Sequence, residues 1–347
     1  MKNLISCIVL AFPLTAFANP LEQNVQGLYE GTWNNGPAEV RVVAMGNDTF
    51  RLMARQTNAI NPARAEVKSK VVDGKLAFAK ANWGAGAIKG KLGNDGTINV
   101  RKVERKSPTL GKQAPAGATI VAGPKGPSGM DRKNNLPWYL STMADHGNPV
   151  DEATLRKNNH PTPGSKKKPG RELYIGVDSD GSFQVPKGGM QSKEFFPGSF
   201  NAHVEFMCNL VSKARSQGRG NSGVFLPTGK EIQILDSFGT GTYLGGGCGG
   251  LYKFKDPDTM EPVLNPAGKD DQKYNLSSLP PQTWQTYDIE FREKKNADGK
   301  AQGFLTVYHN GVKIHDNVEM KPGKGPFRFQ DHGNPVRYRN IWVKPIP

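Results

Sequence analysis

Short stretches of alternating apolar and polar residues recur along most of this 347-residue chain, and turn-forming residues separate them. Alternation with a period of two is typical of strands that bury one face, and no helical period lies between the strands of the C-terminal half. The 41 glycines and 26 prolines also favour short strands joined by turns over long helices. We therefore predict an all-β chain with antiparallel strand pairing, as in sandwiches and barrels.

The first 18 residues have the composition of a secretory signal peptide. Lys2 supplies positive charge, residues 4–12 form a short apolar core, and residues 16–18 are a small-x-small cleavage site. The core is shorter than the roughly 20 apolar residues that a membrane helix needs, and no later stretch is apolar enough. We therefore expect cleavage after Ala18 and a mature protein that is periplasmic or secreted, without a membrane span.

The chain is basic, with a formal net charge of +15. The excess is concentrated in the middle of the chain, between Lys125 and Arg171, and includes the run at residues 166–168. No motif of a nucleic-acid-binding fold accompanies these charges. We interpret them as the solvated charge of a linker and expect no nucleic-acid partner.

The pattern of strands and turns divides the mature chain into three parts. Residues 19–105 contain short strands separated by turn signals, as in a small antiparallel β domain. Residues 106–171 are rich in Pro, Gly and Lys, so we interpret them as a connector, with a short helical turn at Asp151–Lys157. Residues 172–347 form a larger β unit. Its nine predicted strands cover residues 199–210, 222–226, 230–235, 249–254, 283–291, 303–309, 312–317, 327–331 and 339–343.

Polar side chains alternate with apolar ones in three of these strands and could share one face. They are His203 and Glu205 in the first strand, Glu231 and Gln233 in the second, and Arg328, Gln330 and His332 in the third. Asp236 is out of phase and would need a bulge to join Glu231. Polar residues also cover the solvent face of any sandwich, so alternation alone does not identify a site.

A glycine-rich segment precedes the strand that carries Glu231. Residues 217–223 keep Arg219 and Asn221 between their glycines. Glycines allow the backbone to approach a ligand closely, and the intervening Arg and Asn side chains supply hydrogen-bonding groups. This combination favours a ligand-binding face beside Glu231.

The ordered motifs of the C-terminal part resemble the 3-keto-disaccharide hydrolase family. The resemblance covers about residues 172–347, and the segment at residues 105–111 looks like a junction that some members have after an N-terminal β domain. The chain departs from the family at residues 121–126, where an apolar opening strand and a Phe-Asp-Gly turn would be expected. The matching segments are Arg219–Val224, Glu231–Ser237, Cys248–Tyr252, Trp284–Ile289, His309–Val312, Gln330–Gly333 and Tyr338–Val343.

This resemblance implies a concanavalin-A-like jelly roll with a carbohydrate cleft and hydrolysis of glycosides already oxidised to a ketone at C3. A 3-ketone acidifies the C2 proton, so a base can remove it, the C1 substituent leaves, and water adds to the double bond. Such a site needs a base, a proton donor and groups that stabilise the enolate. The candidates are Glu231, Asp236 and His332 for catalysis, and Arg219, Asn221, Gln233, Tyr252, Trp284 and Gln330 for substrate binding.

A divalent metal held by Glu231, Asp236 and His332 is chemically reasonable, because a hard cation would polarise the ketone. No spacing in the sequence requires this metal or any other cofactor. The metal is therefore left open.

Two other functions fit the same residues. A lectin-like module would bind carbohydrate through the same cleft without catalysis, and jelly rolls serve both roles. An endo-glucanase would use two carboxylates about 5 Å apart. Glu231 and Asp236 resemble that Glu-x-Asp-x-x-Glu strand, but Gln233 occupies its central position.

Two cysteines remain after the signal peptide, which contains Cys7. An oxidising compartment would allow a disulfide between Cys208 and Cys248. Two separate thiols, one of them buried in a strand, fit the sequence equally well.

Overall fold

The computed structural model describes residues 19–94, 96–122, 138–139, 172–173, 180–185, 189–192, 194–196, 198–264 and 273–347. The predicted signal peptide, the helical turn at Asp151–Lys157 and much of the predicted connector lie outside these residues. Within the described ranges, no helix has the length and hydropathy needed to cross a membrane.

The N-terminal part is a curved antiparallel sheet preceded by one short helix, α1 (Pro20–Val25), which Asn19 caps by accepting a hydrogen bond from the Glu22 amide. The strand order is β4-β3-β2-β1-β8-β7-β6-β5, and the edge strands β4 and β5 contact each other. Its apolar side chains form a core of their own. The strands are β1 (Gly27–Trp33), β2 (Gly36–Gly46), β3 (Thr49–Gln56), β4 (Arg64–Lys70), β5 (Leu76–Phe78), β6 (Lys80–Gly84), β7 (Ala87–Lys91) and β8 (Thr97–Val103).

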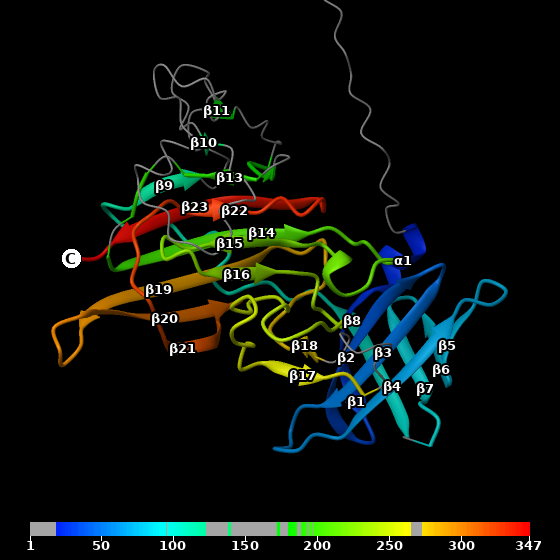
Figure 1. Ribbon diagram of the computed structural model, residues 1–347. Coiled ribbons are helices and arrows are strands. Elements are labelled where there is room, and N and C mark those ends of the chain that lie inside the picture. Colours follow the sequence, from blue (N-terminus) through cyan, green and yellow to red (C-terminus); the bar gives the residue numbers. More distant parts are fainter. Residues whose placement is uncertain are drawn as a thin grey trace, which may run out of the picture.

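The C-terminal part is a sandwich of two antiparallel sheets beside this domain (Figure 1). The six-stranded sheet has the order β11-β10-β13-β22-β15-β16, and a large apolar core lies between the sheets. The predicted jelly-roll sandwich behind a small β domain is thus confirmed. The strands of this sheet are β10 (Trp138–Tyr139), β11 (Glu172–Leu173), β13 (Met190–Gln191), β15 (Ser222–Phe225), β16 (Glu231–Ile234) and β22 (Arg328–Phe329).

The opposite sheet has the order β12-β23-β14-β19-β20-β21, and β9 pairs with the outer side of β23. β9 comes from the predicted connector, so part of that segment belongs to the sandwich. A separate ribbon pairs β17 (Met260–Pro262) with β18 (Lys273–Asn275). The strands of the large sheet are β9 (Thr119–Ala122), β12 (Phe183–Gln184), β14 (Phe200–Cys208), β19 (Gln285–Lys295), β20 (Ala301–His309), β21 (Val312–Met320) and β23 (Val336–Pro345).

Turn chemistry explains where strand prediction succeeds and where it fails. Asn310 and Gly311 have φ values of 51° and 78°, as a tight hairpin turn between β20 and β21 requires. The predicted strand at residues 249–254 is wrong, because this segment forms turns with single bridges from Leu251 to Ile232 and Lys255. Its backbone instead runs beside β16. The Gly249 amide donates to the Gln233 carbonyl, and the Gln233 amide donates to the Gly250 carbonyl.

The three polar strand faces do not form one surface. β14 belongs to the seven-stranded sheet, whereas β16 and β22 flank β15 in the six-stranded sheet. Alternation shows that a side chain leaves the core, but it does not show which of the two outer faces the side chain reaches. His203 and Glu205 therefore lie on a different face from Glu231.

The outer face of β14 holds the segment that joins the two domains. Glu205 accepts hydrogen bonds from the Gly111 amide at 2.6 Å and from Arg339 at 2.8 Å, and Lys112 pairs with Asp288 at 2.7 Å. His203 bonds to Asp288 at 3.0 Å. Burial would raise the pKa of Glu205 and Asp288, but these hydrogen bonds outweigh it and hold both pKa values at about 2.

A buried ion pair joins the domains. Arg219 Nε donates to Asp236 Oδ2 at 2.9 Å, and both side chains are almost completely excluded from solvent. Arg219 also donates to the carbonyl of Ala44 on β2 and to that of Ser212. Asp236 accepts in addition from the Phe238 amide. The loop after β16 is thereby fixed to the N-terminal sheet.

Two arginines of the N-terminal sheet extend this anchor. Arg41 on β2 donates to the carbonyls of Phe238, Asn275 and Leu276, and it lies over the Phe238 ring at 4.9 Å. Arg51 on β3 donates to the Gly239 carbonyl. Carbonyl groups that would be buried without partners are thus satisfied across the interface.

We predict that Asp236→Asn lowers the free energy of unfolding by about 3–5 kcal/mol, because it leaves the buried Arg219 charge without its counter-ion. Arg219→Met with Asp236→Asn should recover part of the loss, since no buried charge remains. Urea unfolding, followed by tryptophan fluorescence, measures both values. The control is Asp258→Asn, which removes an exposed pair with Lys255 and should cost less than about 1 kcal/mol. An equally small effect of Asp236→Asn would contradict the prediction.

Candidate functional site

The outer face of the six-stranded sheet carries a row of polar and aromatic side chains. Strand pairing aligns Gln191, Arg328, Phe225 and Glu231 across β13, β22, β15 and β16. Residues opposite each other in antiparallel strands project on the same face, so the row is continuous. The guanidinium of Arg328 lies over the Phe225 ring, 5.0 Å from its centroid.

Glu231 is the buried acid of this row. It is 6% exposed, and its Oε1 has no hydrogen-bond partner among the described residues. Burial raises the pKa of Glu231 to about 8, while the positive charge of Arg328 acts in the opposite direction. Its carboxyl group lies over Gly223, where an added Cβ would collide with Oε1. A carboxyl group with such a pKa is suited to proton transfer near neutral pH.

Two amide side chains beside Arg328 also have unpaired polar atoms. Gln191 is completely buried, and in the part of the chain that the structure describes neither its Oε1 nor its Nε2 has a partner, nor does Oε1 of Gln330. Phe329, between Arg328 and Gln330, belongs to the core, so the two flanking side chains project outward together. Buried polar atoms without partners are costly, and a bound ligand with hydroxyl groups would satisfy them.

A second set of amide side chains begins at Gln233, two residues from Glu231 on β16, and these amides form hydrogen bonds with one another. Gln233 donates to Asn221 Oδ1 at 2.9 Å, and Asn221 donates to the carbonyl of Gln217 at 2.8 Å. Gln217 in turn donates to Thr242 and to the carbonyl of Gly246. This network fixes the glycine-rich lead-in and the loop after β16 against each other.

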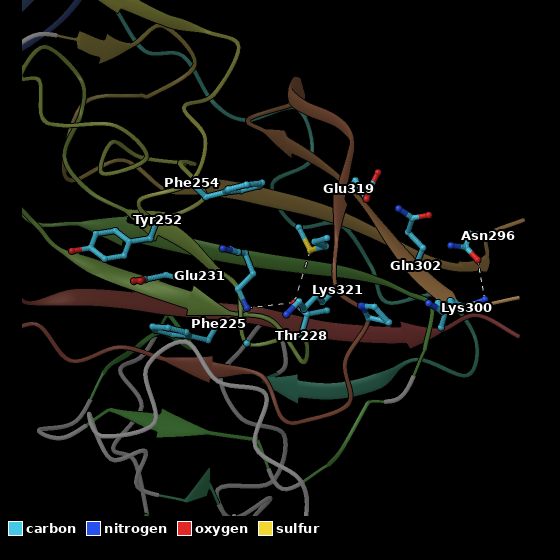
Figure 2. A pocket seen from close by; sticks show the side chains of 15 residues that line it. Phe225, Thr228, Glu231, Tyr252, Phe254, Asn296, Lys300, Gln302, Glu319 and Lys321 are labelled. Atoms are coloured by element: carbon cyan, nitrogen blue, oxygen red, sulfur yellow. Dashed lines mark hydrogen bonds between the residues drawn. The ribbon is translucent and has the colours of Figure 1, made fainter. Parts of the chain in front are cut away.

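A cavity of about 710 Å³ begins at Glu231 and extends toward β20 and β21 (Figure 2). Its volume lies in the range of about 300–1,000 Å³ that small-molecule sites have. Phe225, Tyr252 and Phe254 surround the end near Glu231, whereas Lys300 and other polar residues line the far end. The site therefore combines a buried acid, an adjacent cation and an open cavity.

Comparison with known proteins now identifies the family. A sequence model of the 3-keto-alpha-glucoside-1,2-lyase-like domain matches residues 153–344. The chain belongs to this family. The match confirms the suspected family, and it begins inside the segment predicted as connector. Membership makes the function glycoside-related and the expected ligands carbohydrates.

Solved structures similar to this member of the 3-keto-alpha-glucoside-1,2-lyase-like family include two proposed glycosyl hydrolases from Parabacteroides distasonis ATCC 8503. The first is 26% identical, with a TM-score of 0.45, over 67% of this chain and 85% of the other. The second is 16% identical, with a TM-score of 0.33, over 60% of this chain and 100% of the other. A comparison with curated proteins gave no match.

The structure brings some of the predicted site residues together and separates others. Glu231, Gln233, Gln330 and Tyr252 belong to the face described above or to the cavity. Asp236 lies beyond the end of β16 in its ion pair with Arg219 and does not line the cavity.

Three other predicted residues lie apart or in supporting positions. His332 is exposed on the turn after β22, where its carbonyl accepts from Asn334. Trp284 lines a second cavity, of about 370 Å³, at the domain junction, and the guanidinium of Arg339 lies 4.0 Å from its ring centroid. Asn221 is buried in the amide network.

Three residues of the face were not predicted as site residues: Gln191, Phe225 and Arg328. Alternation with Phe327 and Phe329 predicted that Arg328 lies on a polar face, but the sequence did not show that this face also carries Glu231. Phe225 read as an apolar strand residue, and no motif surrounds Gln191. Only strand pairing shows that all three align with Glu231.

The structure bears on the candidate metal site and on the possible disulfide. In the described part of the chain, no three His, Cys, Asp or Glu side chains gather to hold a metal ion, so Glu231, Asp236 and His332 do not form a ligand set. Cys208 and Cys248 are both buried as free thiols, and burial raises the pKa of Cys248 to about 11.

The raised pKa of Glu231 makes a prediction for stability. The folded state keeps the proton up to about pH 8, whereas the unfolded state loses it near the ordinary pKa of 4.5. The contribution of Glu231 to the free energy of unfolding of the wild type is therefore fully present below about pH 4.5 and is lost as the pH rises to about 8. We predict that the melting temperature of Glu231→Gln, relative to wild type, rises steadily between pH 5 and pH 8.5. Thermal unfolding over this pH range measures the difference, and a constant difference would show that Glu231 ionises normally.

Proposed function

We propose that the protein cleaves 3-keto-glycosides by elimination of the C1 substituent followed by addition of water. The observation that carries the proposal is Glu231, a single buried carboxyl group with a raised pKa, beside Arg328 and an open cavity. Among the described residues that line the cavity, the other acid is Glu319, which is exposed. One acid suits proton abstraction better than double displacement, which requires two.

Glu231 is the base in this mechanism. Its carboxylate removes the C2 proton, the electron pair of the C2–H bond moves toward the C3 ketone, and an enolate forms. A base whose pKa is about 8 is stronger than an exposed carboxylate, although only a minor fraction is ionised at neutral pH. The fraction of active base therefore reaches about one half at pH 8 and rises further above it.

The neighbouring groups would stabilise the charge and hold the sugar. Arg328 places a cation on the face where the enolate oxygen would develop, and this stabilises the transition state more than the ground state. The amide of Gln191 and Oε1 of Gln330, which have no partner among the described residues, would bind sugar hydroxyls. Expulsion of the C1 oxygen, with uptake of a proton, gives a C1=C2 double bond, and water then adds across it.

We predict that the protein turns over a 3-keto-disaccharide and not its unoxidised parent, because only the ketone acidifies the C2 proton. Chromatographic detection of monosaccharide measures turnover. Binding of both compounds without turnover would support a lectin instead, and cleavage of unmodified glucans would support an endo-glucanase.

At the residue level, Glu231→Gln should lower kcat at least about a hundredfold, as loss of a general base does. Wild-type kcat should rise with pH toward a plateau above about pH 8, since the carboxylate is the active form. The matched control is Glu319→Gln, an acid of the same cavity that is exposed, and its kcat should be close to that of wild type. A near-normal kcat for Glu231→Gln would remove Glu231 from the mechanism.

We also infer that the protein acts outside the cytoplasm, because its first 18 residues have the composition of a signal peptide. Expression with the full leader should give a mature protein that begins at Asn19. Intact mass measurement and N-terminal sequencing check this outcome, and an uncleaved Met1 on the folded product would contradict it.

A further inference from the structure

The surroundings of Glu231 differ on its two sides along the strands. Toward Gly223, the face continues into Gln330, whose Oε1 has no partner among the described residues. In the opposite direction lies the cavity, and its near end is lined by the rings of Tyr252 and Phe254 together with Phe225, which lies level with Glu231. One side therefore offers groups that bind hydroxyls, and the other offers flat apolar surfaces.

The few polar groups at the aromatic end are already engaged. The hydroxyls of Tyr252 and Tyr243 bond to each other at 2.9 Å, and the Thr228 hydroxyl accepts from the Lys230 amide at 3.4 Å. The ammonium of Lys230 lies over the Phe254 ring, 4.7 Å from its centroid. A sugar in this place would find few free donors or acceptors for its hydroxyls, so its desolvation would be poorly compensated.

Phe254 provides a second indication of an apolar ligand. Its side chain is 49% exposed, which is unusual for a large apolar residue, and it lies at the wall of the cavity rather than on a convex surface. The loop that carries it is fixed, since the Phe254 amide donates to the Leu251 carbonyl and the Lys255 amide returns to the same carbonyl. Apart from its contact with Lys230, the ring is thus a rigid exposed surface suited to stacking.

We propose that this aromatic end is the leaving-group subsite and that it prefers an aromatic aglycone to a second sugar. The inference rests on the proposed function, which puts the reacting C1–C2 bond at Glu231. The oxidised sugar lies over Arg328, Gln191 and Gln330, and the substituent on C1 enters the cavity between Phe225, Tyr252 and Phe254. The polar far end of the cavity then receives substituents of the aromatic ring.

The test compares the 3-keto derivatives of benzyl and methyl glucoside. Their leaving alkoxides have similar basicity, so a difference in kcat/KM reports the ring and not the chemistry of departure. We expect wild type to prefer the benzyl compound by about three- to tenfold, as one stacking interaction supplies. Phe254→Ala should abolish most of the preference, and Phe254→Tyr, which keeps the ring, should retain it. Val312→Ala, an exposed apolar residue outside the cavity, is the control.

A binding measurement separates this inference from the proposed chemistry. Calorimetry with unoxidised benzyl and methyl glucosides measures binding at the subsite without turnover. The benzyl glucoside should bind about three- to tenfold more tightly, as one stacking interaction supplies, and this difference should depend on Phe254. Failure of turnover with this preference intact would reject the proposed function and keep the subsite. An equal affinity for both glucosides, or a preference that Phe254→Ala leaves unchanged, would overturn the inference. Tighter binding of an unoxidised disaccharide than of benzyl glucoside would also overturn it, since it would assign the subsite to a sugar.

Discussion

The buried pair between Arg219 and Asp236 is the interaction on which the arrangement of the site depends. Arg219 donates hydrogen bonds both to Asp236, which follows β16, and to the carbonyl of Ala44 in the N-terminal sheet. Two charges without access to water are stable only when each is fully paired, so the loop, the strand and the second domain must be positioned together. The same loop bonds to Gln217 through Gly246 and Thr242 and therefore supports the amide network behind Glu231.

This anchor gives the N-terminal β domain a role that its own surface does not reveal. Arg41 and Arg51 satisfy carbonyls of the loops that follow β16 and β18, and the domain thereby acts as part of the scaffold of the sandwich. The joining segment is held as well, because Gly111 and Lys112 bond to Glu205 and Asp288. Glu205 on β14 and Asp288 on β19 thus stabilise the contact between the domains, while Oε1 of Glu231, on the opposite outer face, has no hydrogen-bond partner among the described residues.

Sequence reasoning was most successful where the signal is local. The predicted strands at residues 222–226 and 303–309 are present as β15 and β20, and the family was predicted correctly, because alternation and ordered motifs are properties of neighbouring residues. It failed at residues 249–254, where apolar residues and glycines suggested a strand. There the backbone bonds to both sides of Gln233, a contact between segments that no local pattern encodes.

The sequence by itself determined an all-β chain, the jelly-roll family and the polar character of the strand at Glu231, since each follows from period-two alternation or from motif order. The tertiary structure decided which polar residues meet. It separated Glu205 from Glu231 by placing their strands in different sheets, bound Asp236 to Arg219, and aligned Gln191 and Arg328 with Glu231. The physical reason is that a side chain's neighbours across a sheet, and the burial that raises the pKa of Glu231, depend on strand pairing between residues far apart in the chain.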